Sequence, residues 1–151
     1  MADSDILGGC YCGIVRFQIT GGTQPAMAGF CHCLDCRQAH AAPVYQYVYV
    51  DSNCFRIVSG DDKLAWFTRS AKSRENFRRY FCRRCGSRVY NTLNRRAETA
   101  AGRYIGTFPT LFDNQQLATD NTWGPRKHVG CLEAILDLES WSDGLPRESR
   151  V

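Results

Sequence analysis

The chain has 151 residues, of which 44% are apolar and 23% are charged, and nine are cysteines. A domain of this length buries enough surface to form a hydrophobic core, so the composition excludes a largely disordered chain. The net charge of +4 at neutral pH is a mild excess that by itself indicates no class of partner.

Nothing in the sequence indicates a membrane span or a secretory leader. The longest apolar stretch, residues 42–50, is far shorter than the roughly 20 residues that a spanning helix needs. The first residues are acidic, whereas a secretory leader starts with a basic patch and an apolar block. We therefore predict a cytoplasmic protein with no membrane partner. Because the cytosol disfavours disulfides, its cysteines are expected to bind metal or to react.

Short β-like segments follow one another along the chain. Residues 14–20 alternate Val15, Phe17 and Ile19 with polar side chains, which is the pattern of a strand with one buried face. Aromatic and β-branched residues predict further strands at residues 44–50, 55–58, 64–68, 77–81 and 88–93. Helical periodicity is weak, and it predicts only a turn or two at residues 34–40 and 114–118.

These segments predict an all-β or β-dominated fold. No internal repeat or linker divides the chain, so we predict a single domain over residues 1–151, with its core at about 7–141. The mixed charges and the Gly-Leu-Pro of residues 139–151 predict an irregular segment that lies over the sheet or frays from it. Its last part, residues 142–151, is assigned as a C-terminal tail.

Seven of the nine cysteines fall in three tight groups. The groups are Cys10 and Cys12; Cys31, Cys33 and Cys36; and Cys82 and Cys85. Structural zinc takes four protein ligands, whereas catalytic zinc typically takes three and keeps one position open. One closed and one open site would therefore use all seven cysteines.

The spacing within the groups favours one division of the cysteines. Cys82 and Cys85 have the two-residue gap of a zinc knuckle, and in a strand Cys10 and Cys12 would point to the same face. One metal bound by both pairs would close a loop of about 70 residues. The spacing also allows two other assignments of the metal ligands. Cys10, Cys12, Cys31 and Cys33 could form the closed site, or His32, His40 or His128 could complete the second site.

Three motifs of the chain resemble the glutathione-dependent formaldehyde-activating enzyme (GFA) family, a domain shared with centromere protein V. The motifs are Gly-Gly-Cys-Tyr-Cys-Gly-Ile-Val-Arg-Phe, Cys-His-Cys-Leu-Asp-Cys-Arg and Phe-Cys-Arg-Arg-Cys-Gly-Ser. The resemblance covers Gly8 to about Val89, and the later His128 and residues 141–146 look like the closing region of the family.

The resemblance implies a fold, a metal arrangement and an activity. The fold would be of the Mss-four-like type, with small coiled β-sheets around zinc. Cys10, Cys12, Cys82 and Cys85 would bind a structural zinc, and Cys31, Cys33 and Cys36 a catalytic zinc. The implied activity is that of a carbon–sulfur lyase, which makes or breaks the bond between glutathione and formaldehyde in S-hydroxymethylglutathione. Glutathione would be the co-substrate, or a related thiol would take its place.

Residues near the third cysteine group are further site candidates. His32 and His40 are candidate catalytic residues because imidazole titrates near neutral pH, although His32 could also point to solvent and His40 could form the pocket wall. Arg37 and Gln38 are candidates for binding glutathione. Since the family commonly has small residues after the third cysteine, the bulky His40 is expected to alter the pocket.

A basic stretch offers an alternative function of another class. Residues 69–88 contain eight lysines and arginines, one glutamate and three aromatic residues. A solvated strand face is the default interpretation of such charges. Basic and aromatic residues around a zinc knuckle also fit a non-catalytic module that contacts nucleic acid or a protein partner. The enzyme is our leading hypothesis, so we expect a small-molecule thiol, and not nucleic acid, as the partner.

Overall fold

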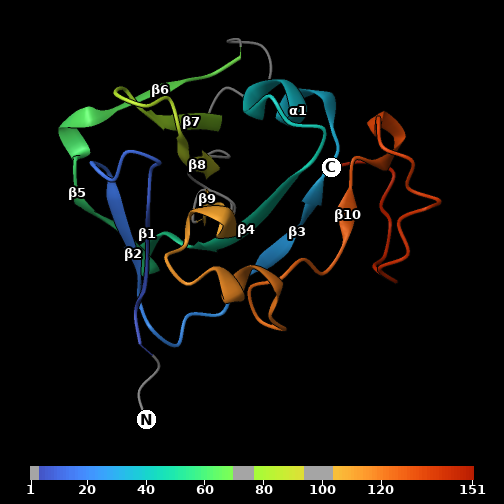
Figure 1. Cartoon of the computed structure of the whole chain (residues 1–151), viewed down its shortest axis with the longest axis horizontal. Helices are drawn as coiled ribbons and strands as arrows, with labels where there is room; N and C mark the ends of the chain where they lie inside the picture. Colours follow the sequence, from blue (N-terminus) through green and yellow to red (C-terminus); the bar gives the residue numbers. More distant parts are fainter. Residues whose placement is uncertain (1–3, 70–76, 94–103) are drawn as a thin grey trace, which may run out of the picture.

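The computed structural model describes residues 4–69, 77–93 and 104–151, which form two β-sheets and one α-helix (Figure 1). The small sheet has the order β1-β2-β5, with β1 at Ile6–Gly9, β2 at Arg16–Ile19 and β5 at Phe55–Ser59. The large sheet has the order β10-β3-β4-β9-β8-β7-β6. Its strands are β3 (Met27–Cys31), β4 (Tyr45–Asp51), β6 (Leu64–Phe67), β7 (Phe77–Cys82), β8 (Arg88–Leu93), β9 (Tyr104–Thr107) and β10 (His128–Val129).

Helical structure in the described residues is short. The helix α1, Leu34–His40, follows β3 directly and ends at Ala41, which adopts the left-handed conformation. The described residues also contain the 3-10 turns η1 (Ser52–Cys54), η2 (Asp61–Lys63), η4 (Pro109–Leu111), η5 (Gln115–Thr119) and, after the last strand, η6 (Cys131–Glu133). The predicted β-dominated fold is therefore confirmed, and no helix of the described residues has the length and apolar character needed to cross a membrane.

The predicted strands are found near their expected positions, but four strands of the described residues were not predicted. Those predicted are β2, β4, β5, β6, β7 and β8, while β1, β3, β9 and β10 were missed. β1 ends in two glycines and β3 contains Ala28 and Gly29, so each has only one β-branched or aromatic residue to indicate a strand. β10 has only two residues and pairs in parallel with β3. The segment predicted at 114–118 is the 3-10 turn η5.

The hydrophobic core lies between the two sheets. Phe17 and Ile19 of β2 pack against Val48 and Val50 of β4, and all four side chains are fully buried. Because side chains alternate along β4, the same strand presents Tyr45, Tyr47 and Tyr49 to the opposite face of the large sheet. That opposite face is available for a functional site.

The C-terminal segment runs beside β10. Backbone hydrogen bonds of 2.8 Å join His128 N–H to the carbonyl of Pro146 and Glu148 N–H to the carbonyl of His128. As predicted, residues 139–151 are largely irregular, with one isolated bridge between Arg147 and His128. Figure 1 shows this segment, in red, on the opposite side of the molecule from β1 and β2.

Candidate metal sites and the adjoining pocket

Four cysteines form a compact group between the two sheets. The Sγ atoms of Cys10, Cys12, Cys82 and Cys85 all lie within 4.8 Å of one another. Cys12 Sγ is 3.5 Å from Cys10 Sγ and 3.9 Å from Cys82 Sγ. Four sulfurs about 2.3 Å from a central zinc ion would be separated by roughly 3.8 Å. These four thiols therefore fit a tetrahedral metal site.

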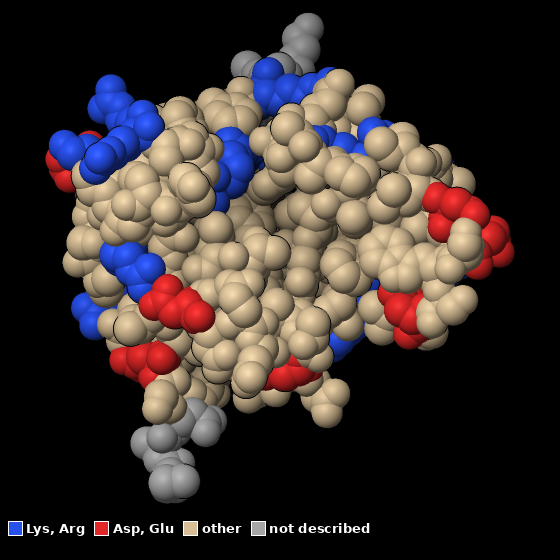
Figure 2. All heavy atoms as spheres, in the orientation of Figure 1, with Lys and Arg blue, Asp and Glu red and all other residues tan. Residues whose placement is uncertain are grey.

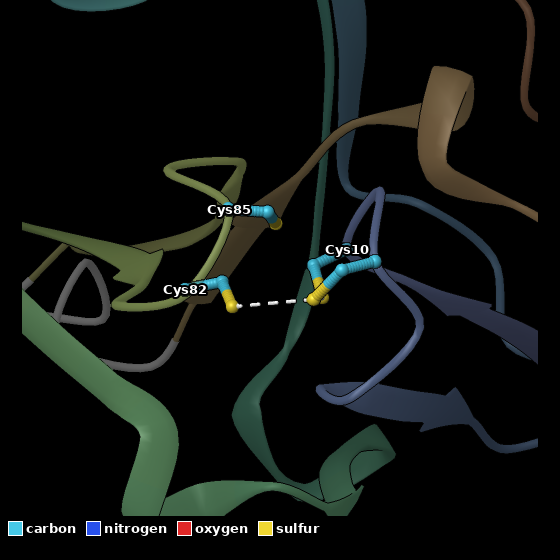
Figure 3. A group of neighbouring side chains, drawn as sticks. Cys10, Cys82 and Cys85 are labelled. Carbon is cyan, nitrogen blue, oxygen red and sulfur yellow. Dashed lines mark hydrogen bonds between the residues drawn. The ribbon is translucent and has the colours of Figure 1, made fainter.

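Two similar turns bring these four thiols together. Cys10 and Cys12 lie in the turn between β1 and β2, and Cys82 and Cys85 lie at the turn between β7 and β8 (Figure 3). Each connection contains a glycine with φ of +77°, Gly13 and Gly86, a conformation that side chains disfavour. The two turns also contact each other, since Tyr11 N–H donates to Ser87 Oγ at 3.0 Å.

Ser87 also favours metal binding by Cys85. Desolvation opposes ionisation of this thiol, but hydrogen bonds with Ser87 and Cys12 lower the pKa of Cys85 to about 6. Cys85 is therefore ionised at neutral pH, and the thiolate is the form that binds metal.

A second group contains Cys31, Cys33 and Cys36. Cys31 ends β3, Cys33 is the N-cap residue of α1, and Cys36 lies in the first turn of that helix. The Sγ atoms of Cys31 and Cys33 are 3.4 Å apart, again close to the spacing of two ligands on one ion. Within the described residues no histidine belongs to either group, so the thiols divide into four and three.

The histidine between two of these cysteines lies in a buried network. His32 is fully buried, and its Nε2 lies 2.9 Å from Nδ1 of His128, which is also fully buried. Nε2 of His128 is 2.7 Å from a carboxylate oxygen of Asp143. Desolvation, followed by electrostatic contributions from His128 and Arg37, lowers the pKa of His32 and so disfavours its protonated form. His32 therefore points into the protein and not to solvent.

The candidate residues on α1 have different environments. Arg37 donates from Nε to the carbonyl of His32 and from a terminal nitrogen to the carbonyl of Glu133, both at 2.9 Å. Gln38 is exposed. The ring of His40 stacks on Tyr45 with a centroid separation of 4.2 Å, and its Nε2 is buried without a hydrogen-bond partner. None of these three residues lines the pocket described next, whereas Cys31, Cys33 and Cys36 do.

A pocket of about 850 Å³ opens beside the three cysteines. This volume is typical of sites for small-molecule ligands. Its floor is the face of the large sheet opposite the core, and its walls come from the start of α1 and from the C-terminal segment. The floor residues are Met27, Cys31, Tyr45, Tyr47, Tyr49, Tyr104, Phe77 and Arg79. Figure 2 shows the hollowed surface, with lysine and arginine side chains beside it.

The tyrosines of β4 are the functional candidates that sequence reasoning missed. Tyr45, Tyr47 and Tyr49 alternate along a strand that pairs with β3, where Tyr45 lies opposite Cys31. The Sγ of Cys36 is 3.5 Å from the hydroxyl of Tyr45. The Tyr-x-Tyr-x-Tyr pattern in the predicted strand could have indicated one polar aromatic face. The sequence could not show that this face adjoins the cysteines.

Glycines on neighbouring strands make room for these rings. A Cβ atom at Gly106 of β9 would lie 2.7 Å from the ring of Tyr49. A Cβ at Gly29 of β3 would lie 3.0 Å from the hydroxyl of Tyr47 and 2.6 Å from the carbonyl of Lys127. The tyrosine rings therefore lie across the adjacent strands and form a continuous floor.

Comparisons with known proteins agree with this arrangement. The sequence profile of the family described as glutathione-dependent formaldehyde-activating enzyme matches residues 5–131. The chain belongs to this family. The match confirms the resemblance seen in the three cysteine motifs and includes both cysteine groups. A search of curated proteins finds no match.

One solved structure supports the fold of this GFA-family chain. A crystal structure of a Rhodobacter sphaeroides protein superimposes with a TM-score of 0.57 at 17% sequence identity. The alignment covers 93% of this chain and 98% of the other. At this level of identity the similarity supports the fold alone.

Proposed function

We propose that this protein is a zinc-dependent carbon–sulfur lyase that forms or cleaves S-hydroxymethylglutathione or a related thiol adduct. The observation that carries the proposal is the group of Cys31, Cys33 and Cys36 on the wall of a ligand-sized pocket in a GFA-family chain. Two metal ions would be bound, one by each cysteine group.

The two groups would have different roles. Cys10, Cys12, Cys82 and Cys85 offer four sulfurs, which complete the coordination of a structural zinc. Cys31, Cys33 and Cys36 offer three, which leaves one position for a ligand from the pocket. A zinc ion bound there would supply Lewis acidity and favour the thiolate form of a thiol.

Cleavage of the adduct breaks the carbon–sulfur bond and converts the hydroxymethyl group to formaldehyde. The electron pair of that bond goes to sulfur, and the hydroxyl proton leaves the oxygen as the carbonyl forms. Formation of the adduct is the reverse of these steps. The protein must therefore orient sulfur and oxygen and manage one proton.

Tyr45 is suitably placed to orient the oxygen. Its hydroxyl lies 3.5 Å from Cys36 Sγ, and burial raises its pKa, so it stays protonated at neutral pH and can donate a hydrogen bond. His40 stacks on the same ring. We retain His40 and His32 as candidates for moving the proton, each acting through a neighbouring group, and Arg37 and Gln38 as candidates for contacting glutathione.

Two arginines of the alternative nucleic-acid-binding stretch, residues 69–88, stack on aromatic rings of β6. The guanidinium of Arg78 lies 4.2 Å from the ring centre of Trp66, and that of Arg88 lies 4.3 Å from that of Phe67. Both rings lie outside residues 69–88, and they remain 47% and 39% exposed, respectively. Lys72 and Arg74 lie outside the described residues.

The test is exchange spectroscopy by NMR on the zinc-loaded protein with glutathione and formaldehyde. Wild-type protein is expected to accelerate exchange between free glutathione and S-hydroxymethylglutathione. Cys33→Ser should lose this acceleration and one equivalent of zinc while keeping the fold. Cys54→Ser is the matched control, because Cys54 belongs to neither cysteine group. Exchange in the wild type no faster than in buffer would contradict the proposed function.

A further inference from the structure

Arg79 of β7 is a buried cation on the floor of the pocket. It has 7% of its surface exposed, and its Nη1 atom is buried without a hydrogen-bond partner. A buried guanidinium nitrogen that bonds to nothing has lost its hydration without replacement. Since Arg79 is part of the pocket lining, a ligand in the pocket could supply the partner that the chain itself does not provide.

The other charged groups of the pocket that the structure describes are largely satisfied within the protein. Arg69 forms an ion pair with Asp35, and Lys127 pairs with Glu148 at 2.9 Å. Glu133 accepts a hydrogen bond from Leu34 N–H at 2.6 Å. Among the described lining residues, Arg79 is thus the buried cation that has no carboxylate partner.

A second arginine near Arg79 adds positive potential. Arg88 of β8 also has buried nitrogens, Nε and one terminal nitrogen, without hydrogen-bond partners. Burial and the nearby charge of Arg79 lower the pKa of Arg88 to about 10, which still leaves it charged at neutral pH. The acidic group that interacts with both arginines is the thiol of Cys36, and no carboxylate of the described residues forms an ion pair with either arginine.

The orientation of Arg79 is fixed by its strand. Its guanidinium carbon lies 4.5 Å from the ring centre of Phe77, which lines the same pocket. Stacking on an aromatic face holds the planar group while leaving its edge free for hydrogen bonds. A planar, oriented guanidinium matches the two oxygens of a carboxylate better than a spherical anion.

Arg79 also lies close enough to the cysteines to act on the same ligand. Arg79 and Cys36 both line the pocket. A ligand with its sulfur at the cysteines would extend over the tyrosine floor toward Arg79.

We propose that Arg79 is an anion subsite of this pocket and binds a carboxylate of the thiol substrate, with Arg88 reinforcing its potential. The substrate class is accordingly a thiol that carries a carboxylate some bonds away from its sulfur. This inference rests on the proposed function, since it assigns one end of the same substrate.

The experiment compares glutathione with its diethyl ester, which keeps the thiol and lacks both carboxylates. Binding to the zinc-loaded protein is measured by calorimetry, and exchange with formaldehyde is measured separately. Wild type is expected to bind glutathione at least about tenfold more tightly than the ester, as a charge-assisted hydrogen bond implies. Arg79→Gln should remove most of this preference by weakening glutathione binding, while the affinity for the ester stays the same.

Two further variants control for charge and folding. Arg78→Gln removes the same charge from the adjacent position of β7, where the side chain stacks on Trp66, and should keep the preference. Arg79→Lys keeps the charge but loses the planar guanidinium with its paired N–H donors. Its preference for glutathione over the ester should therefore lie between those of the wild type and Arg79→Gln. Zinc content and circular dichroism verify that each variant is folded.

The outcomes separate the subsite from the reaction. If Arg79→Gln loses the preference for glutathione over the ester and Arg78→Gln keeps it, the subsite is supported, whether or not the protein catalyses exchange with formaldehyde. Absence of catalysis would contradict only the proposed function. Equal binding of glutathione and ester by the wild type, or no binding of either, would overturn the subsite even if exchange were catalysed. The subsite would also be overturned if Arg79→Gln kept the full preference for glutathione over the ester.

Discussion

The imidazole of His40 is a neutral group buried between aromatic rings. It stacks on Tyr45 and meets the edge of Phe108 at a centroid distance of 4.8 Å. Burial, with repulsion from Arg88 as the second cause, lowers the pKa of His40 to about 4. An unfolded histidine titrates at about 6.5. Below that pH the unfolded chain binds a proton that the folded chain excludes, so His40 reduces the free energy of unfolding as the pH falls from 6.5 to about 4.

Replacing His40 by Phe should remove this part of the pH dependence. The new ring can keep the stacking on Tyr45, and it takes up no proton. Urea unfolding at pH 7 and pH 4.5 measures the effect. The loss of stability between these pH values should be smaller in His40→Phe than in the wild type, by about 2 kcal/mol. Equal losses would show that the imidazole is not excluded from protonation.

Asp143 supports the loop of the second cysteine group through two histidines. The chain of contacts runs from Asp143 through His128 to His32, which lies between Cys31 and Cys33. Groups that hold a metal loop in place typically affect metal affinity by about 10- to 100-fold.

Asp143→Ala is therefore expected to weaken zinc binding at the three-cysteine group by about tenfold or more. The four-cysteine group should be unaffected. Competition with a chromophoric chelator resolves the two sites. Asp137→Ala is the control, because this exposed carboxylate bonds only within its own turn, to Glu139 and Ser140. Equal metal affinities in Asp143→Ala and Asp137→Ala would refute a supporting role for the network.

At the scale of the elements, the two faces of β4 have different roles. Val48 and Val50 face the core, while Tyr45, Tyr47 and Tyr49 face the pocket. β9 accommodates this arrangement because Gly106, which pairs with Tyr49, has no side chain. The pocket floor thus depends on a glycine of another strand.

Gly106→Ala should destabilise the protein by about 1–3 kcal/mol, because its Cβ would overlap the ring of Tyr49. A double-mutant cycle with Tyr49→Leu tests the cause. If the overlap is responsible, the smaller Leu side chain should recover part of the loss, and the two effects should not add. Additive losses in urea unfolding would mean that the alanine is unfavourable for another reason.

At the scale of the whole molecule, the four-cysteine group joins the two sheets. Cys10 and Cys12 come from the small sheet, and Cys82 and Cys85 from the turn of β7 and β8 in the large one (Figure 3). Metal binding at such a site contributes roughly 10–16 kcal/mol at neutral pH, comparable with the total stability of a domain.

Cys82→Ser is accordingly expected to abolish cooperative folding, and Cys33→Ser to leave it intact. Thermal unfolding followed by circular dichroism distinguishes the two variants. Chelation of the wild-type protein should reproduce the Cys82→Ser result once both sites are empty. If both variants unfolded alike, both cysteine groups would be structural, and the case for chemistry at the second would fail.

The sequence by itself indicated the β-dominated fold class, the family and the grouping of the candidate metal-binding cysteines. These features depend on local patterns, namely the alternation of side chains along strands and the spacing of ligands. The strands rich in glycine or alanine, β1 and β3, are recognisable only once their neighbours are in place. The tertiary structure alone decided that His32 is buried against His128, that three tyrosines adjoin the cysteines, and that Arg79 lines the same pocket as the cysteines. Each of these contacts joins residues that are far apart in the chain. Strand pairing brings such residues together, and the order of residues along the chain does not show it.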